Sequence, residues 1–247
     1  MRKYLVHTCL AEPRPKGAVS RRAGRHANFR KFAPGLILIA VPWSLGSQTV
    51  SFDSAPPGSL PAGWTATMTH EGGAPRWEIV ADDTAPSRPN ALAQTSTDPT
   101  SARFPLAIYD QASLRDGALS VRFKAVSGQR DRAAGLVWRY RDENNYYIVR
   151  ANALENNVVL YKVEGGKRLS LEPKGTPPKT YGVKEPVPSE TWSTLAVSFH
   201  GSLFTVTFNG KKLFEVEDST FADAGKVGLW TKADSVTYFD DFRVTGK

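Results

Sequence analysis

Aromatic, basic and amide side chains recur together in two stretches of the 247-residue sequence, around residues 138–162 and 230–234. Residues two apart on an extended strand point the same way, which places Arg150 with Asn152 and Trp230 with Lys232. Flat aromatic rings can stack on the C–H faces of sugars, while bidentate polar side chains can bind sugar hydroxyls. We therefore predict a carbohydrate-binding site formed by Trp138, Arg139, Tyr147, Arg150, Asn152, Lys162, Trp230, Lys232 and Asp234.

A structural interpretation of the same residues competes with this one. Trp138 and Tyr147 could be ordinary core residues, because large aromatic side chains dominate the apolar area of protein interiors. The basic side chains could equally pair with Asp142, Glu143 or Glu155. The placement of these side chains on the folded strands decides between a groove and a core.

Catalytic chemistry finds less support in the sequence. Retaining glycosidases need two carboxyl groups about 5 Å apart, and Glu215 and Glu217 would share one face of a strand. No third acid stands in register with them, so we interpret the pair as a solvated strand face and predict no catalytic residue. His70 and His200, the only histidines after residue 46, have no zinc-site spacing. The sequence also lacks a nucleophile elbow, a phosphate loop and a dinucleotide motif.

Asp240 and Asp241 are the candidate metal ligands. Carboxylate oxygens suit a hard cation, so the pair could hold a structural calcium ion together with backbone carbonyls. The alternative is a charged pair at a bulge or strand end that accepts backbone hydrogen bonds. No other cofactor is predicted.

The segments that must position these residues read as β-strands. In residues 117–126, apolar side chains at every second position from Leu119 to Ala125 alternate with polar ones, so one face is buried. Further strands are predicted at 48–53, 76–81, 91–95, 104–109, 133–141, 145–152, 157–164 and 167–171. So many strands must hide their apolar faces against another sheet. The predicted fold class is all-β, a two-sheet antiparallel β-sandwich.

The last quarter of the chain predicts two hairpins. Alternating apolar runs at 195–199 and 204–208 are joined by His200-Gly201-Ser202. Asn209-Gly210 then predicts a tight two-residue turn, because both residues tolerate positive φ.

The basic character of the chain belongs to its first 46 residues. Of the 32 basic and 24 acidic residues, nine and one lie there, which leaves 23 of each in the remainder. The net charge of +8 is therefore no argument for nucleic acid binding. The basic stretch precedes a short apolar segment, 32–43, that Pro34 and Pro42 make unfit to span a bilayer.

This pattern predicts a signal peptide over residues 1–46 with a long basic region, for which a start codon further downstream is one explanation. The single cysteine, Cys9, lies within it, so the remainder of the chain uses no disulfide. We expect export to the periplasm or the extracellular space, with no membrane span. Residues 47–247 are expected to form one domain with a proline-rich loop at 172–190, either a binding rim or a solvated insertion.

Residues 133–164, together with Asn209-Gly210, 225–234 and 239–244, resemble the concanavalin A-like lectin/glucanase superfamily. Within it, they are most similar to exported bacterial laminin G-like domains grouped with 3-keto-disaccharide hydrolases. The resemblance implies a jelly roll whose concave sheet carries the ligand groove. Hydrolase-type members show Asn-Ser-Gly before the first arginine-bearing strand and a glutamate on the next, whereas this chain has Arg132-Ala-Ala-Gly135 and Tyr146-Tyr-Ile-Val-Arg150.

The sequence thus favours an exported, lectin-like domain acting on a polysaccharide or glycoside, with carbohydrate as its partner. One alternative is a glycoside hydrolase or lyase of the 3-keto-disaccharide hydrolase type, drawing its acids from Asp142, Glu143, Glu155 or Asp234. Another is a structural or adhesion module without a small ligand.

Overall fold

The computed structural model describes residues 46–246, which form sixteen β-strands and no α-helix. Except for Gly46, the predicted signal peptide lies outside the described residues, as does Cys9. The described residues contain no helix that could cross a membrane.

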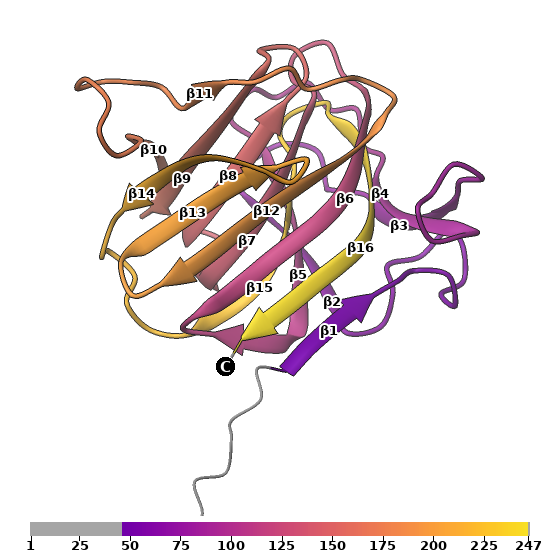
Figure 1. The fold of residues 1–247 in the computed structure, drawn as a ribbon. Coiled ribbons are helices and arrows are strands. Elements are labelled where there is room, and N and C mark those ends of the chain that lie inside the picture. Colours follow the sequence, from indigo (N-terminus) through magenta and orange to yellow (C-terminus); the bar gives the residue numbers. More distant parts are fainter. Residues whose placement is uncertain (1–45, 247) are drawn as a thin grey trace, which may run out of the picture. The chain divides into compact units, whose positions relative to one another are not determined.

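Two sheets stack face to face (Figure 1), and we call them the front and back sheets as that view shows them. The front sheet has the order β14 (Lys211–Glu217), β13 (Leu203–Phe208), β12 (Trp192–His200), β6 (Gly117–Ser127), β16 (Val236–Gly246), β4 (Asn90–Gln94) and β3 (Trp77–Ala81). A further strand, β1 (Gly46–Val50), pairs with β16.

The back sheet has the order β10 (Lys167–Leu171), β9 (Asn157–Glu164), β8 (Asn145–Asn152), β7 (Ala133–Asp142), β15 (Gly225–Trp230), β5 (Phe104–Leu114) and β2 (Trp64–Thr69). The short strand β11 (Val183–Lys184) pairs with β9. All these strand pairs are antiparallel, so the predicted all-β sandwich is confirmed.

The core between the sheets follows the predicted alternation. Leu119, Val121 and Phe123 of β6 are buried there, as are Leu195 and Val197 of β12. Each fully buried side chain of this kind contributes about 1.5–3 kcal/mol through removal of apolar surface from water. The alternating hydrophobic residues therefore determine which face of the front sheet packs against the back sheet.

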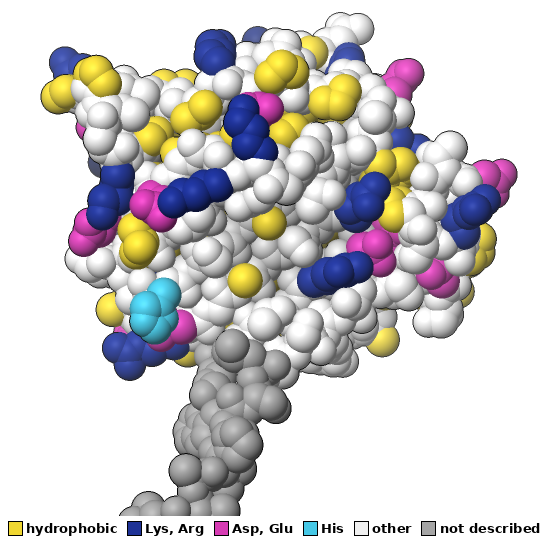
Figure 2. Space-filling view, viewed as in Figure 1, with side chains coloured by type: hydrophobic (Ala, Val, Ile, Leu, Met, Phe, Trp, Pro, Cys, Tyr) yellow, Lys and Arg dark blue, Asp and Glu magenta, His cyan; other side chains and the backbone are white. Residues whose placement is uncertain are grey.

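The outer face of the front sheet carries the complementary residues. Ala118 and Ser120 of β6 lie beside Ala196 and Ser198 of β12, with none of them fully buried. Figure 2 shows this face, where small side chains occupy the centre and charged ones lie mostly towards the margins. The aromatic side chains of Trp192 and Tyr238 flank Lys124 on this sheet, with ring centres 5.2 and 5.3 Å from its Nζ.

The predicted turns have the expected backbone. Asn209 and Gly210 have φ values of 47° and 80°, which a type I′ turn between β13 and β14 requires. The residues between β12 and β13 form the other predicted hairpin, with Gly201 at φ 55°. The prediction missed β2 and β11, because β2 is rich in Thr and Ala and β11 has only two residues.

A β-bulge redirects the end of β7. The register of β7 against β8 shifts after Trp138, and Arg139 adopts φ 48°. Gly225 lies against this bulge, since a Cβ there would stand 2.5 Å from the carbonyl carbon of Arg139. The buried guanidinium of Arg139 then donates to the carbonyl oxygens of Arg115, Gly201 and Phe221 at 2.6–3.1 Å. One side chain thus holds three separate turns.

We predict that Arg139→Met lowers the free energy of unfolding by about 3 kcal/mol, because it removes four hydrogen bonds from a buried guanidinium to three backbone carbonyl groups. Urea denaturation measures this directly. The matched control is Arg141→Met, whose side chain is 43% exposed and pairs with Asp223; it should change stability by less than about 0.5 kcal/mol. Equal effects of the two changes would contradict the structural role of Arg139.

Candidate functional site

The outer face of the back sheet carries a second apolar cluster, separate from the core between the sheets. It comprises Phe104, Leu106, Ile108, Ala133, Val137, Tyr146, Ile148, Val159, Tyr161, Val163 and Trp230. These side chains are buried although they point away from the front sheet. The centre of the face is therefore filled, and polar side chains gather at one end of it.

Four predicted site residues do not reach this outer face. Trp138 and Tyr147 stack on each other at 5.4 Å within the core between the sheets. Arg139 lies over the core rings of Phe199 and Phe204. Lys162 points away from the outer face and contacts residues after β14, at 2.6 Å from Thr220 and 3.5 Å from Asp218. Trp138 and Tyr147 are therefore core residues, as the alternative interpretation of the sequence expected.

Arg150, Asn152, Trp230 and Lys232 do come together, as their spacing predicts. Arg150 on β8 and Trp230 on β15 both stand opposite Gly135 on β7. A Cβ at Gly135 would lie 2.7 Å from the Ile148 side chain and 3.3 Å from that of Trp230, so the glycine makes room on this face. Residues from three neighbouring strands thus form one row.

A continuous set of hydrogen bonds joins the charged groups at this end, and we call its members the polar cluster: Asp131, Arg150, Asn152, Glu155, Asn157 and Lys232. Arg150 donates to Glu155 at 2.8 Å and to Asn157 at 3.0 Å. Asn152 donates to Asp131 at 2.7 Å, and Lys232 donates to the other oxygen of Asp131 at 2.6 Å. Each carboxylate of the cluster is paired with one cation, Asp131 with Lys232 and Glu155 with Arg150, and Asn152 donates to both carboxylates.

Asp234 supports the cluster without joining it. Its carboxylate accepts the backbone N–H groups of Gln129, Arg130 and Asp131 at 2.8–3.1 Å. Burial raises the pKa of Asp234, but these backbone donors outweigh it and lower the pKa overall. Asp234 therefore fixes the loop that presents Asp131.

Several residues of this face escaped the sequence prediction. Asp131 and Asn157 complete the hydrogen bonds of the polar cluster. Tyr161 lies under the Arg150 guanidinium at 5.7 Å, and its hydroxyl hydrogen bonds to that of Tyr181. Tyr181 comes from the proline-rich loop and is 47% exposed. The two-residue period of 157–164 could have placed Asn157 with Tyr161, whereas no local signal marks Asp131 or Tyr181.

The carboxylate of Glu155 is held ionised. Burial raises the pKa of Glu155, but hydrogen bonds and charge from Arg150 outweigh it and lower the pKa to about 2. Asp131 is paired with Lys232. The lowered pKa of Glu155 disfavours a protonated carboxyl near neutral pH, which a glycosidase uses as its general acid.

The other acids considered lie elsewhere. Asp142 accepts hydrogen bonds from Asn144 and Asn145 in the turn after β7. Glu215 and Glu217 share an outward face of β14, where the nearby Lys212 and Lys174 lower their respective pKa values. Both therefore match a solvated strand face.

Asp240 and Asp241 lie at a bulge of β16, where Asp241 adopts φ 48°. The buried Asp240 carboxylate accepts hydrogen bonds from the backbone and hydroxyl of Ser87 at 2.7–3.0 Å. Burial raises the pKa of Asp240. Within residues 46–246, no group of three His, Cys, Asp or Glu side chains could hold a metal. Calcium binding at this pair stays a prediction.

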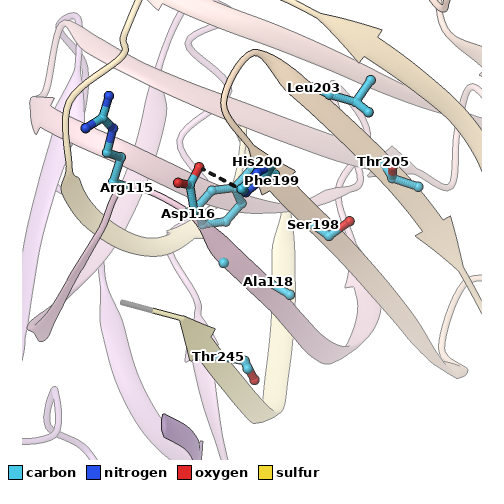
Figure 3. Close-up of a pocket in the computed structure, with 10 residues that line it drawn as sticks. Arg115, Asp116, Ala118, Ser198, Phe199, His200, Leu203, Thr205 and Thr245 are labelled. Carbon is cyan, nitrogen blue, oxygen red and sulfur yellow. Dashed lines mark ion pairs between the residues drawn. The ribbon is translucent and has the colours of Figure 1, made fainter. Parts of the chain in front are cut away.

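A separate depression of about 840 Å³ opens at the end of β12 (Figure 3). Ser198 and His200 line it together with Asp116, whose carboxylate lies 3.7 Å from His200 Nδ1. These residue types occur in hydrolase triads. However, His200 is 92% exposed and has no hydrogen bond to Ser198 among the described residues, so the nucleophile is not activated.

We predict that the Arg150–Glu155 pair stabilises the fold above pH 4.5 and that this contribution disappears as the pH falls from 4.5 towards 2. The direction follows because folding lowers the pKa of Glu155. Glu155→Gln should reduce the free energy of unfolding by about 1–2 kcal/mol at pH 6, allowing for solvent screening of its 40% exposed side chain, and by almost nothing at pH 2. Urea denaturation across this range measures both values.

Asp223→Asn is the control, because the Asp223 side chain is 84% exposed beside Arg141. It should leave stability nearly unchanged at both pH values. A pH-independent loss in Glu155→Gln would show that the charge of Glu155 contributes nothing.

The chain matches a known protein family in sequence and several solved structures in fold. A family model described as "3-keto-alpha-glucoside-1,2-lyase-like domain" matches residues 48–245. The fold resembles carbohydrate-binding module CBM66 from Bacillus subtilis, at 19% identity over 73% of this chain and 94% of that chain, with a TM-score of 0.53. It also resembles the Bacillus licheniformis β-glucanase, at 11% identity over 82% of this chain and 98% of that chain, with a TM-score of 0.53.

A third likeness is to domain 4 of AbnA, a GH43 extracellular arabinanase from Geobacillus stearothermophilus, in complex with arabinotriose. It has 14% identity over 82% of this chain and 92% of that chain, with a TM-score of 0.51. The comparison with curated proteins gives no match.

At these identities, the solved structures share the fold, and the predicted concanavalin A-like jelly roll is confirmed. The family model covers nearly all of the described residues. The chain belongs to the family of 3-keto-α-glucoside-1,2-lyase-like domains.

Proposed function

We propose that this chain is an exported carbohydrate-binding domain whose ligand lies on the outer face of the back sheet, at the polar cluster. The observation that carries the proposal is the fixed chain of hydrogen bonds from Lys232 through Asp131 and Asn152 to Glu155 and Arg150, which reaches solvent at the 40% exposed side chain of Glu155. A row of oriented donors and acceptors can bind the hydroxyls of a sugar without reorganisation.

An accessible aromatic ring stands beside the polar cluster. Tyr181 is nearly half exposed, and its hydroxyl contacts that of Tyr161. The neighbouring β11 pairs with β9 at Lys184 and Asn157, so the proline-rich loop approaches this end of the face, near the top of Figure 1. Such a ring can stack on a sugar, which supports the loop's predicted role as a binding rim.

The relatives point in the same direction. A carbohydrate-binding module, a β-glucanase and an arabinanase domain in complex with arabinotriose share this fold. The arabinanase is described as extracellular, which agrees with the signal peptide predicted from the sequence.

A hydrolase or lyase is the second candidate, favoured by the description of the family model. In the polar cluster, an ionised Glu155 could accept a proton, but its lowered pKa makes it unfit to donate one, and the Asp131 carboxylate is engaged by Lys232. Binding without turnover is therefore the function that the geometry favours.

We predict that an array of plant and bacterial oligosaccharides, probed with the full chain, identifies a ligand that Lys232→Ala weakens at least tenfold, about 1.4 kcal/mol. The physical reason is the loss of the cation that faces the ligand and orients Asp131. Tyr181→Ala should weaken binding by a similar factor, because it removes the exposed ring. Isothermal titration calorimetry gives both values.

Lys212→Ala is the control, since Lys212 lies on β14 at the far edge of the front sheet. It should bind the same oligosaccharide as the unchanged protein does. A product assay by mass spectrometry should find that the bound oligosaccharide stays intact. Full binding by both Lys232→Ala and Tyr181→Ala would place the ligand elsewhere, and product formation would favour the enzyme.

A further inference from the structure

Among residues 46–246, one cation of the outer face, Arg168, has no ionic partner. It lies on β10, opposite Val163 of β9, and its side chain crosses the second apolar cluster. The guanidinium carbon is 4.6 Å from the ring centre of Tyr161, 4.9 Å from that of Phe104 and 5.8 Å from that of Trp230. Arg168 therefore rests on three aromatic rings contributed by β9, β5 and β15.

The contrast with the neighbouring cations is clear. Arg150 pairs with Glu155, and Lys232 pairs with Asp131. Among the residues that the structure describes, no carboxylate lies within ion-pair distance of Arg168, and its Nη1 is buried without a hydrogen-bond acceptor. Aromatic faces attract a cation, but they supply no acceptor in the plane of the guanidinium. Within the part of the chain that the structure describes, the Nη1 donor of Arg168 is therefore unused.

A second unused donor lies on the same side of the sheet. The Nε of Arg150 is buried without an acceptor, although both terminal nitrogens are bonded to Glu155 or Asn157. Arg150 and Arg168 both lie over the ring of Tyr161, at 5.7 and 4.6 Å. Two cations near one ring repel each other, and the single carboxylate of Glu155 neutralises only one of them.

These groups differ from what a neutral sugar alone would need. A hydroxyl both donates and accepts, and proteins often use free carboxylates to accept from it. Here the carboxylates are occupied by Arg150 and Lys232, while the unused groups of this face, Arg150 Nε, Arg168 Nη1 and the Trp230 indole N–H, are donors only. A planar guanidinium matches a carboxylate or sulfate oxygen pair better than it matches one hydroxyl.

We propose that the outer face of the back sheet prefers a carbohydrate that bears a negatively charged oxygen group, and that Arg168 binds this charge. The inference rests on the proposed function, since it specifies the ligand of the same face. A uronate carboxylate and a sulfate ester share the required chemistry. Arg168 extends the polar cluster across the apolar centre, so the charged group lies over the aromatic rings.

The test uses an array of neutral oligosaccharides, the same oligosaccharides oxidised at C6 to uronates, and their O-sulfated forms. We expect the full chain to bind a charged form at least tenfold more tightly than its neutral parent at low salt. This preference should shrink as the salt concentration rises from 50 to 500 mM, because added ions screen an exposed pair. The uronate and sulfate arms show which group is bound.

Arg168→Gln should reduce the charged-to-neutral preference to less than about threefold while changing the affinity for the neutral parent by less than about threefold. Arg141→Gln is the matched control, because it removes the same charge from a side chain that pairs with Asp223. It should retain the preference. Arg168→Lys keeps the charge without the planar fork and should give an intermediate preference, which keeps the test informative if Arg168→Gln unfolds.

Equal binding of neutral and charged forms would overturn this inference and leave the proposed function standing. If Arg168→Gln weakened the affinity for the neutral and the charged oligosaccharide by the same factor, with its thermal unfolding unchanged, Arg168 would not be the group that recognises the charge. Failure of every form to bind would overturn the proposed function itself, and the inference with it.

Discussion

The candidate site depends on the burial of a single charge, that of Arg150. Burying a guanidinium away from solvent costs free energy unless its N–H groups find hydrogen-bond acceptors. Glu155 and Asn157 are the acceptors for Arg150. Glu155 also accepts from Asn152, which in turn donates to Asp131. Satisfying one buried cation thus fixes the turn after β8 and connects it to the loop before β7.

The remaining supports act on the same loops from further away. Asp234 holds the backbone of residues 129–131, and Lys232 binds Asp131 from the other side. The buried Arg103 donates to the carbonyls of Gly73, Ala74 and Ala233, which ties the loop after β15 to the loop after β2. Strands supply the positions of the polar groups, and buried arginines fix the loops between them.

The sequence predicted the sandwich well because alternation reports burial directly, as in Leu119 to Ala125. It predicted the site only in part. Alternation places Arg150 with Asn152 on one face, but it cannot tell which face meets the other sheet when both faces are apolar. Trp138 and Tyr147 therefore fell in the core between the sheets. Asp131 and Arg168 reach the outer face of the back sheet through tertiary contacts with Asn152 and Tyr161. No local sequence pattern predicts these contacts.

The central claim is that carbohydrate binds the outer face of the back sheet. Nuclear magnetic resonance of the isotope-labelled chain, titrated with an oligosaccharide that it binds, tests this most directly. We expect the largest chemical-shift changes at Glu155 and the Tyr181 loop, where the polar cluster meets solvent, with a smaller change at the buried Asn152 bonded to Glu155. Changes confined to the outer face of the front sheet, around Ser198 and His200, would contradict the account.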